Sequence, residues 1–132
     1  MFSIFSVSGS ALSAQSQRLN VVASNLANVD AVAGPDGESY KARHVVFQTA
    51  PMGDGGAAGV KVVGIKESDT PGRKVYSPEH PLADEQGYVT HSNVSAVDEM
   101  VDMISASRSY QNNVEVMNTA KTLLLKTLQL GQ

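Results

Sequence analysis

The sequence predicts an α+β fold. A long helix at each end of the chain pairs with the other as an antiparallel, coiled-coil-like hairpin, and a small antiparallel β-rich domain is inserted between the two helices. Three observations predict this fold: a long uninterrupted helical pattern at the end of the chain, a heptad pattern at its beginning, and short β-like runs among Gly and Pro between them. The expected parts are residues 1–31, 32–92 and 93–132, with the two helices forming one core domain.

The helix expected near the end of the chain covers residues 95–130, a stretch that contains neither Pro nor Gly. Ser95 is placed to begin it, because a serine before the first turn can accept a hydrogen bond from the backbone N–H of Asp98. The apolar residues recur in steps of three and four, as they do along one face of a helix: Val97, Met100, Ile104, Tyr110, Val114, Met117, Leu124 and Leu128. A helix of this length is about 50 Å long, too long to be covered by the rest of so small a chain. Its apolar stripe therefore needs another long partner.

The beginning of the chain shows a heptad pattern. Large apolar residues recur at every seventh position, and the positions three further on complete an a/d seam: Phe5, Leu12, Leu19 and Leu26, followed by Ser8, Gln15, Val22 and Val29. Arg18 is the only charged residue before Asp30, and Ser, Gln, Ala and Asn cover the remaining surface. A neutral, hydrogen-bonding surface indicates close packing against other protein, because a solvated helix normally carries Lys and Glu. The alternative is a poorly ordered, polar N-terminus.

Between Asp30 and Ser92 the helical period is replaced by short runs rich in β-branched and aromatic residues. A glycine-rich stretch, residues 52–59, is expected to form the tip of a hairpin. The runs predict an antiparallel sheet of three or four strands, two of them stronger (39–49 and 59–66) and two weaker (73–76 and 88–91).

Composition excludes several classes of function. The formal net charge is −3 and no basic cluster is present, which argues against a nucleic-acid-binding surface. Cysteine is absent, so disulfides, thiol catalysis and cysteine-based metal sites are excluded. The sequence has no signal-peptide pattern and no apolar run long enough to span a bilayer, so we expect no direct membrane insertion.

No residue pattern typical of an active site stands out. The three histidines, His44, His80 and His91, are scattered, and none forms a metal-binding helical pair with another. The densest polar cluster, in residues 79–85, is interpreted as a solvated turn, with a metal or acid–base site as the alternative. Neither a nucleophile elbow nor a phosphate-binding loop is present. We therefore expect a structural protein, not an enzyme, with no cofactor and no metal site.

Many spaced motifs occur in one order along the chain. They are Ser10–Gln15, Ala23–Val29 with its S-x-N-x-A-N pattern, Tyr40–Lys41, Val45–Phe47, Tyr76–Pro78, His80–Ala83, Gly87–Val89, Asn93–Val94, Ser105–Glu115 and Leu128–Gln132. With these motifs the chain resembles the flagellar axial rod and hook protein family, and within it the proximal rod proteins of the bacterial flagellar basal body. Ser92 stands where a Pro commonly occurs in the family, which leaves open how the strand near His91 turns into the last helix.

The resemblance implies a structural subunit of the proximal rod, a hollow drive shaft that transmits torque and passes export substrates. It implies export by the flagellar type III machinery without a cleaved signal peptide, followed by self-association in a helical assembly in the periplasm. It also implies neighbours: FlgB and FliE towards the membrane ring, and FlgF and FlgG distally.

The residues expected at the assembly interface lie in the two terminal helices. They are Phe5, Leu12, Leu19, Leu26, Asn25, Asn28, Tyr110, Val114, Met117, Leu124 and Leu128. Asn25 and Asn28 have two interpretations: an inter-subunit hydrogen bond, as the family motif suggests, or capping of the first helix by a residue that tolerates left-handed geometry. Tyr110 is either an inter-subunit contact or part of a solvated face.

Two other classes of protein remain as alternatives. One is a small coiled-coil adaptor that binds partner helices without polymerising. The other is an enzyme or a ligand-binding β-domain that folds within residues 32–92 and carries helical extensions.

Overall fold

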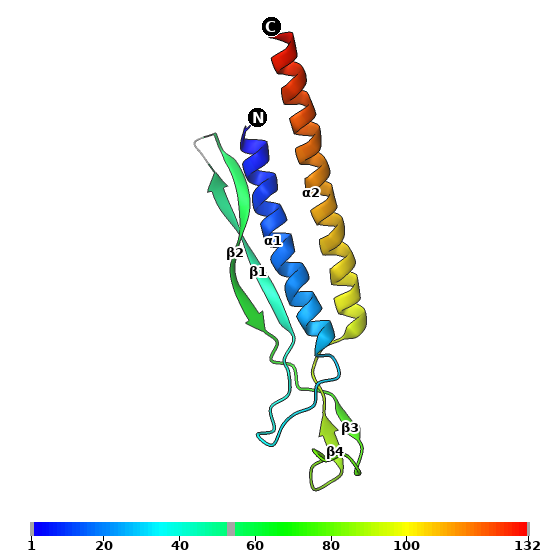
Figure 1. Ribbon diagram of the computed structural model, residues 1–132. Coiled ribbons are helices and arrows are strands. Elements are labelled where there is room, and N and C mark those ends of the chain that lie inside the picture. The colour runs from blue at the N-terminus through cyan, green and yellow to red at the C-terminus, as the bar shows by residue number, and fades with distance from the viewer. Residues whose placement is uncertain (1, 53–54, 132) are drawn as a thin grey trace. The chain divides into compact units, whose positions relative to one another are not determined.

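The computed structural model describes residues 2–52 and 55–131. Its elements, in chain order, are α1 (Phe2–Ala27), β1 (Arg43–Met52), β2 (Ala57–Glu67), β3 (Lys74–Tyr76), β4 (Tyr88–Thr90) and α2 (Ala96–Leu130) (Figure 1). The α+β fold class is confirmed, because two long helices flank a small antiparallel β region. Both helices lie within their expected ranges.

The strands form two separate two-stranded sheets, β1 with β2 and β3 with β4. The expectation of one sheet of three or four strands was therefore wrong. The Ser68 N–H still donates to the Ala42 carbonyl at 2.8 Å, just beyond the strand ends. The pairing stops there because the Asn93 side chain takes the neighbouring backbone groups: its Oδ1 accepts from the Ala42 N–H at 2.6 Å, and its Nδ2 donates to the Thr70 carbonyl at 2.7 Å. The expected hairpin tip lies partly outside the described residues.

The shorter sheet is an antiparallel pair in which Lys74, Val75 and Tyr76 face Thr90, Val89 and Tyr88. The rings of Tyr76 and Tyr88 meet edge to face with centroids 5.3 Å apart. Gly87 precedes β4 with a φ of 87°, and a Cβ there would lie 2.9 Å from the Tyr76 ring. Glycine is therefore required at this turn both by its backbone conformation and by the tyrosine beside it.

The chain divides into two compact units, and each contains a part of both helices. The first unit comprises Met1–Leu19, Val45–Gly64 and Ile104–Gln132. The second unit comprises Asn20–His44 and Ile65–Met103, and so holds the short sheet and the loops.

In the first unit, the segments of α1 and α2 lie side by side and run in opposite directions (Figure 1), and the Ile4 side chain lines a hollow with residues of α2. The buried positions on the two helices are small: Ser8, Ala14, Ala106 and Ala120. Small residues let two helix backbones approach closely. The large heptad residues Phe5 and Leu12 are half-buried.

The β1–β2 hairpin of the first unit is attached to α1 through Ser10. The Ser10 hydroxyl donates to the Val7 carbonyl at 2.7 Å and accepts a hydrogen bond from the Val60 N–H at 3.0 Å. Gly59 is buried beside it, and a Cβ at Gly59 would lie 2.6 Å from the Ser10 Oγ and 2.7 Å from the Met52 methyl carbon. A side chain at position 59 would therefore require the Ser10 hydroxyl and the end of the Met52 side chain to move.

The start of α2 is fixed by three nearby polar residues in the second unit, Ser92, Asn93 and Ser95. The Ser92 hydroxyl donates to the Val29 carbonyl at 2.7 Å, and the Asn93 Oδ1 accepts from the Ala42 N–H at 2.6 Å. The Ser95 hydroxyl accepts from the Asp98 N–H at 3.5 Å, which confirms the expected cap. Ser92 therefore serves the turn into α2 by hydrogen bonding, a role that a proline at this position could not fill.

Candidate assembly surfaces

A polar cluster around Asn25 occupies the interior of the second unit. Asn25 is 0% exposed, and its side chain makes four hydrogen bonds. The Oδ1 atom accepts from the Tyr40 hydroxyl at 2.8 Å and from the Arg43 N–H at 3.0 Å. The Nδ2 atom donates to the Arg43 carbonyl at 2.8 Å and to Oε2 of Glu99 at 3.0 Å. One amide thus joins the end of α1, the start of β1 and the first turn of α2.

Both expected interpretations of Asn25 are corrected by this geometry. The amide neither caps α1 nor faces a neighbouring subunit, because all of its donors and acceptors are used inside the chain. The one sequence signal for burial of Asn25 was its position three residues after Val22, which places the amide on the buried side of α1. Its partners lie between 15 and 74 residues away, so no local pattern could identify them.

Asn28 lies just after the end of α1. Its Nδ2 donates to the Ser24 carbonyl at 2.8 Å, and the same carbonyl also accepts from the Asn28 N–H at 3.2 Å, so the side chain adds a second hydrogen bond to the last turn. The left-handed geometry expected for this residue is not observed. Among the described residues only glycines have positive φ values, so no asparagine adopts the left-handed geometry.

The remaining residues expected at an assembly interface fall into two groups by exposure. The first group is half-buried and packs partly within the chain: Phe5, Leu12, Leu19, Leu26, Met117 and Leu124. The second group is exposed, on α2: Tyr110, Val114 and Leu128. Sequence reasoning found this helix but could not separate its covered from its uncovered positions.

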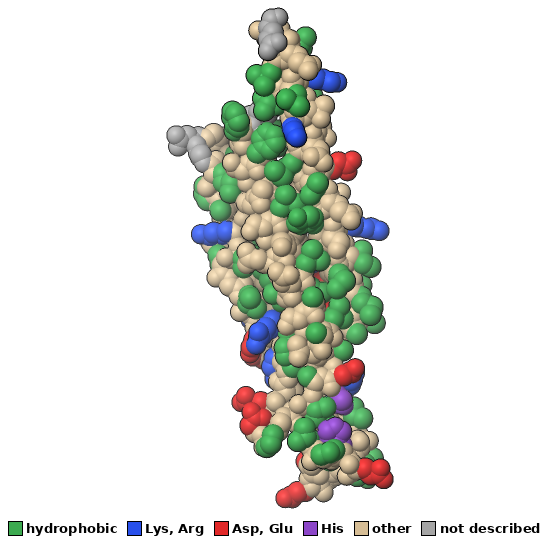
Figure 2. Space-filling view, in the orientation of Figure 1, with side chains coloured by type: hydrophobic (Ala, Val, Ile, Leu, Met, Phe, Trp, Pro, Cys, Tyr) green, Lys and Arg blue, Asp and Glu red, His purple; other side chains and the backbone are tan. Residues whose placement is uncertain are grey.

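Large apolar side chains lie on the outside of α2. In the second unit Val97, Met100 and Val101, within about one turn of α2, are 69%, 55% and 60% exposed. In the first unit Val116, Leu123, Leu125 and Leu128 are also exposed. Figure 2 shows hydrophobic side chains gathered over this helix, with few charged groups among them. So many large apolar side chains exposed along one helix are typical of docking surfaces.

The hairpin of the first unit is exposed in the same way. Val46, Phe47 and Val63 are exposed apolar residues on strands that pair only with each other. A two-stranded hairpin is marginally stable alone and needs a further layer to pack against. The hairpin therefore adds a second apolar surface that the described part of the chain leaves uncovered.

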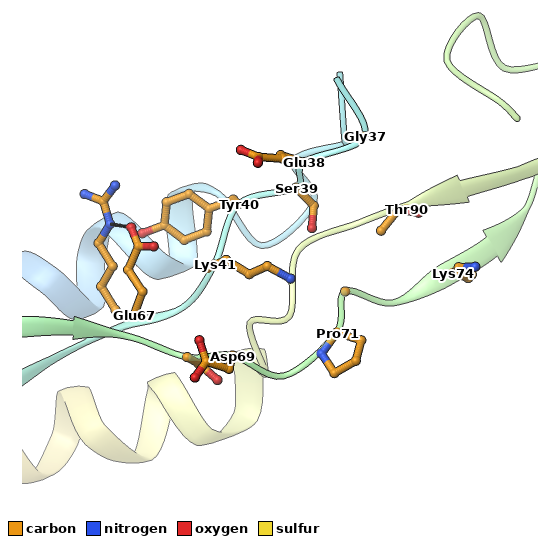
Figure 3. A pocket seen from close by; sticks show the side chains of 13 residues that line it. Gly37, Glu38, Ser39, Tyr40, Lys41, Glu67, Asp69, Pro71, Lys74 and Thr90 are labelled. Atoms are coloured by element: carbon orange, nitrogen blue, oxygen red, sulfur yellow. Dashed lines mark ion pairs between the residues drawn. The ribbon is translucent and has the colours of Figure 1, made fainter. Parts of the chain in front are cut away.

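A polar hollow of about 780 Å³ opens in the second unit and is shown in Figure 3. Charged side chains of both signs line it, and several are already engaged. Arg43 pairs with Glu67 at 3.4 Å and lies over the Tyr40 ring at 5.7 Å, while the Lys41 ammonium donates to the Thr70 carbonyl at 3.3 Å. These contacts link loop segments.

His44 lies close to two acidic residues that are distant from it in the sequence. His44, Glu99 and Asp102 each offer a ligand atom, and these atoms lie within 4.8 Å of one another. Glu99 is 2% exposed, whereas His44 is exposed at the start of β1. Such groupings are common in proteins that bind no metal, and we assign no ligand to this one.

The polar cluster in residues 79–85 is a solvated turn, as expected. The His80 Nδ1 accepts from the Leu82 N–H at 3.0 Å, and Asp84 Oδ1 accepts from the Gln86 and Tyr88 N–H groups at 2.9 Å each. These side chains stabilise their own loop.

Within the described residues, no helix is long and apolar enough to cross a membrane.

Two long helices that bury small residues against each other, and present large apolar residues outward, define a structural protein built for association with other helices. Comparison with known proteins gives the same class. Residues 5–35 match the family described as flagella basal body rod protein, and residues 85–130 match the family described as flagellar basal body rod FlgEFG protein C-terminal.

Full-length relatives narrow the class to one family. The chain is 58% identical to the flagellar basal-body rod protein FlgC of Escherichia coli O157:H7, over 100% of this chain and 98% of that protein. It is 56% identical to FlgC of Salmonella typhimurium strain LT2 and 58% identical to FlgC of Yersinia enterocolitica, with the same coverage. The chain belongs to the FlgC family of flagellar basal-body rod proteins. It is a structural subunit of the flagellar proximal rod, and the relatives are rod proteins, not enzymes.

Proposed function

We propose that this rod subunit polymerises through its terminal helices into the hollow drive shaft of the proximal rod, which transmits torque and passes export substrates. The observation that carries the proposal is the apolar surface of α2, where Val97, Met100 and Leu128 are exposed while the buried residues of the helix are Glu99, Ala106 and Ala120. A helix pair with this distribution is complete only when other helices cover it.

Transmission of torque requires contacts that resist shear. Many interdigitated side chains along two long helices distribute the force over weak bonds that are individually small and collectively large. The helices of 26 and 35 residues provide that length. The proposed interface residues are Phe5, Leu12, Leu19, Leu26, Asn28, Tyr110, Val114, Met117, Leu124 and Leu128, with Asn25 acting inside the subunit.

The proposed neighbours are FlgB, FlgF and FlgG in the rod and FliE at the junction with the membrane ring, together with further copies of this chain. Family membership supports them. The proposed place of assembly is the periplasm, reached through the flagellar type III export machinery without a cleaved signal peptide. A cysteine-free chain fits this route, because it cannot form wrong disulfides when it passes from a reducing to an oxidising compartment.

The proposed division of labour follows the chain. Residues 1–31 and 93–132 form one helical core domain that carries the polymer contacts, and residues 32–92 form a β-rich middle domain with no catalytic role. What supports this division is the concentration of exposed apolar residues on α2 and the engagement of polar groups within the loops.

The experiment that tests the proposal measures helix content and size together. Purified full-length chain is examined by far-UV circular dichroism and sedimentation velocity, alone and mixed with the neighbouring rod proteins. Gain of helix signal together with growth of large particles is expected, because the exposed faces of α2 become covered on association. A compact, strongly helical dimer that ignores those proteins would instead identify the coiled-coil adaptor and end the rod proposal.

A further inference from the structure

An apolar groove lies on one side of α2 in the first unit. A hollow of about 490 Å³ is lined by Ile4 of α1 and by Asn112, Glu115, Val116, Thr119, Ala120 and Leu123 of α2. A second hollow of about 360 Å³ shares Ile4 and Val116 with it and extends to Val7 and Ala58. The two hollows therefore adjoin at Ile4 and Val116, and together we call them the Val116 groove. Glu115 is its only charged residue.

A narrow apolar stripe runs along the opposite side of the same helix. Each residue of an α-helix advances by about 100°, so Val116 and Leu123 share one direction, while Val114 and Leu125 share another that is about 160° away. The exposed residues on this second side, which we call the Val114 stripe, are Tyr110, Val114, Lys121, Leu125 and Leu128. The buried Ala106 points between the groove and the stripe, and the buried Ala120 lies at the edge of the groove. The groove and the stripe therefore lie on either side of the buried face of α2.

The two surfaces are complementary in charge. Lys121 is the only charged residue in the Val114 stripe, and Glu115 is the only one in the Val116 groove. Within the described residues neither has an ion-pair partner. Two grooves that met each other would oppose Glu115 to Glu115, and two stripes would oppose Lys121 to Lys121. Only a groove that meets a stripe brings opposite charges together.

We propose that the Val116 groove of one copy of this chain receives the Val114 stripe of the next copy, with Glu115 paired to Lys121 across the contact. The contact is heterologous, because each copy contributes a different surface and keeps its second surface available. Such contacts generate closed rings or helical tubes, depending on the rotation between copies. This inference rests on the proposed function and adds to it a direction: every subunit in a turn of the rod faces the same way.

The absence of cysteine makes a cross-linking test clean, because any cysteine introduced is the only one in its copy. Two tagged full-length versions, Val116→Cys and Leu125→Cys, are expressed together in cells that lack the native chain and build flagella. After mild oxidation, we expect a disulfide-linked dimer that contains one copy of each version. Each version expressed alone should give at most about a tenth of that dimer. Thr122→Cys, an exposed position between the two surfaces, is the matched control.

Charge reversal tests the ion pair, with the yield of the mixed disulfide-linked dimer as the measurement. Glu115→Lys or Lys121→Glu alone should reduce the mixed dimer by about tenfold or more, since like charges across an interface cost several kcal/mol and each 1.4 kcal/mol is tenfold. The double variant should restore it. Lys126→Glu, which faces about 140° away from Lys121, controls for the change in net charge. Circular dichroism of each purified variant excludes unfolding.

The outcomes separate this inference from the proposed function. Basal bodies isolated from the same cells report whether the chain enters the rod. If the chain enters the rod but the mixed pair does not exceed the control, or if one version alone forms the dimer, the heterologous contact is wrong and the rod function stands. If the chain never enters the rod, both are wrong. Failure of the double charge variant to restore the dimer overturns the Glu115–Lys121 pairing.

Discussion

Different kinds of contact stabilise the interior of each of the two units. In the second unit, directional hydrogen bonds join the end of α1, the start of β1 and the start of α2 at one buried amide, Asn25. Among the described residues of the first unit, the buried positions of the helices are small, as at Ala106 and Ala120, and no polar residue there joins as many segments as Asn25 does.

The difference teaches how one small chain combines a defined shape with a surface for assembly. A buried polar centre tolerates substitution poorly, because removal of one partner leaves the others without hydrogen bonds in a dry interior. A contact between small residues uses little apolar area, so the large apolar residues remain available on the outside. We therefore expect substitutions in the second unit to act on folding, and substitutions on the outer face of α2 to act on assembly.

The largest effect on stability is expected for Asn25→Ala. The change removes four hydrogen bonds and leaves the backbone groups of Arg43 and the buried carboxylate of Glu99 without this partner. The free energy of unfolding should fall by about 3 kcal/mol or more, since each buried group left unsatisfied costs about 1–3 kcal/mol. Urea unfolding followed by circular dichroism measures it.

Asn28→Ala is the matched control for that change. It removes one side-chain hydrogen bond near the end of the same helix and should cost only about 1 kcal/mol. Equal losses from the two variants would contradict the special position of Asn25 in the second unit.

A smaller effect is expected for Gly59→Ala in the first unit. The new Cβ would lie within 2.6 Å of the Ser10 Oγ, and overpacking of a tight site typically costs about 1–3 kcal/mol. Gly64→Ala is the control on the same strand, because nothing lies within 4 Å of a Cβ there. Thermal unfolding of the two variants compares them, and an equally stable Gly59→Ala protein would refute the close contact between β2 and α1.

Leu124→Ala should have a moderate effect on folding and a large one on assembly. Leu124 is half-buried on α2, so truncation should cost about 1–2 kcal/mol, below the range for a fully buried leucine. Leu125→Ala, at the exposed neighbouring position, should leave the stability of the isolated subunit within about 0.5 kcal/mol of the original. We also expect both Leu124→Ala and Leu19→Ala to stop completion of the rod, and normal motility of cells carrying either variant would contradict that expectation.

The sequence predicts the helices well, because their signals are local. Steps of three and four residues mark both helices, and Ser95 caps α2 through a residue three positions away. The strands were found near their true places for the same reason. The first expected strand began too early, at residue 39 instead of Arg43, and the backbone N–H of Ala42, just before β1, donates to the Asn93 side chain and not to a strand.

The division between inner and outer faces could not be predicted from periodicity. The period of large apolar residues marks a face of α2, but Val97 and Met100 on that face are exposed, while the buried face is marked by Ala106 and Ala120. In a subunit of a larger assembly, large residues serve contacts that a single chain does not contain. The role of Asn25 was missed because its partners are distant in sequence and become adjacent only in the folded chain.

The smallest effect on folding, and the most direct separation of folding from assembly, is expected for the double variant Val97→Ser and Met100→Ser. Both residues are more than half exposed, so the stability of the isolated subunit should change by about 0.5 kcal/mol or less. If these side chains are buried in the rod, each loss removes about 1.5 kcal/mol or more of interface free energy, roughly tenfold in affinity. The amount of chain in isolated basal bodies should therefore fall sharply, while Gln111→Ser, at an exposed polar position of α2, should leave it unchanged. A double variant that enters basal bodies normally would show that this part of α2 faces solvent in the rod. The exposed apolar residues proposed to act in assembly would then be those of the first unit alone.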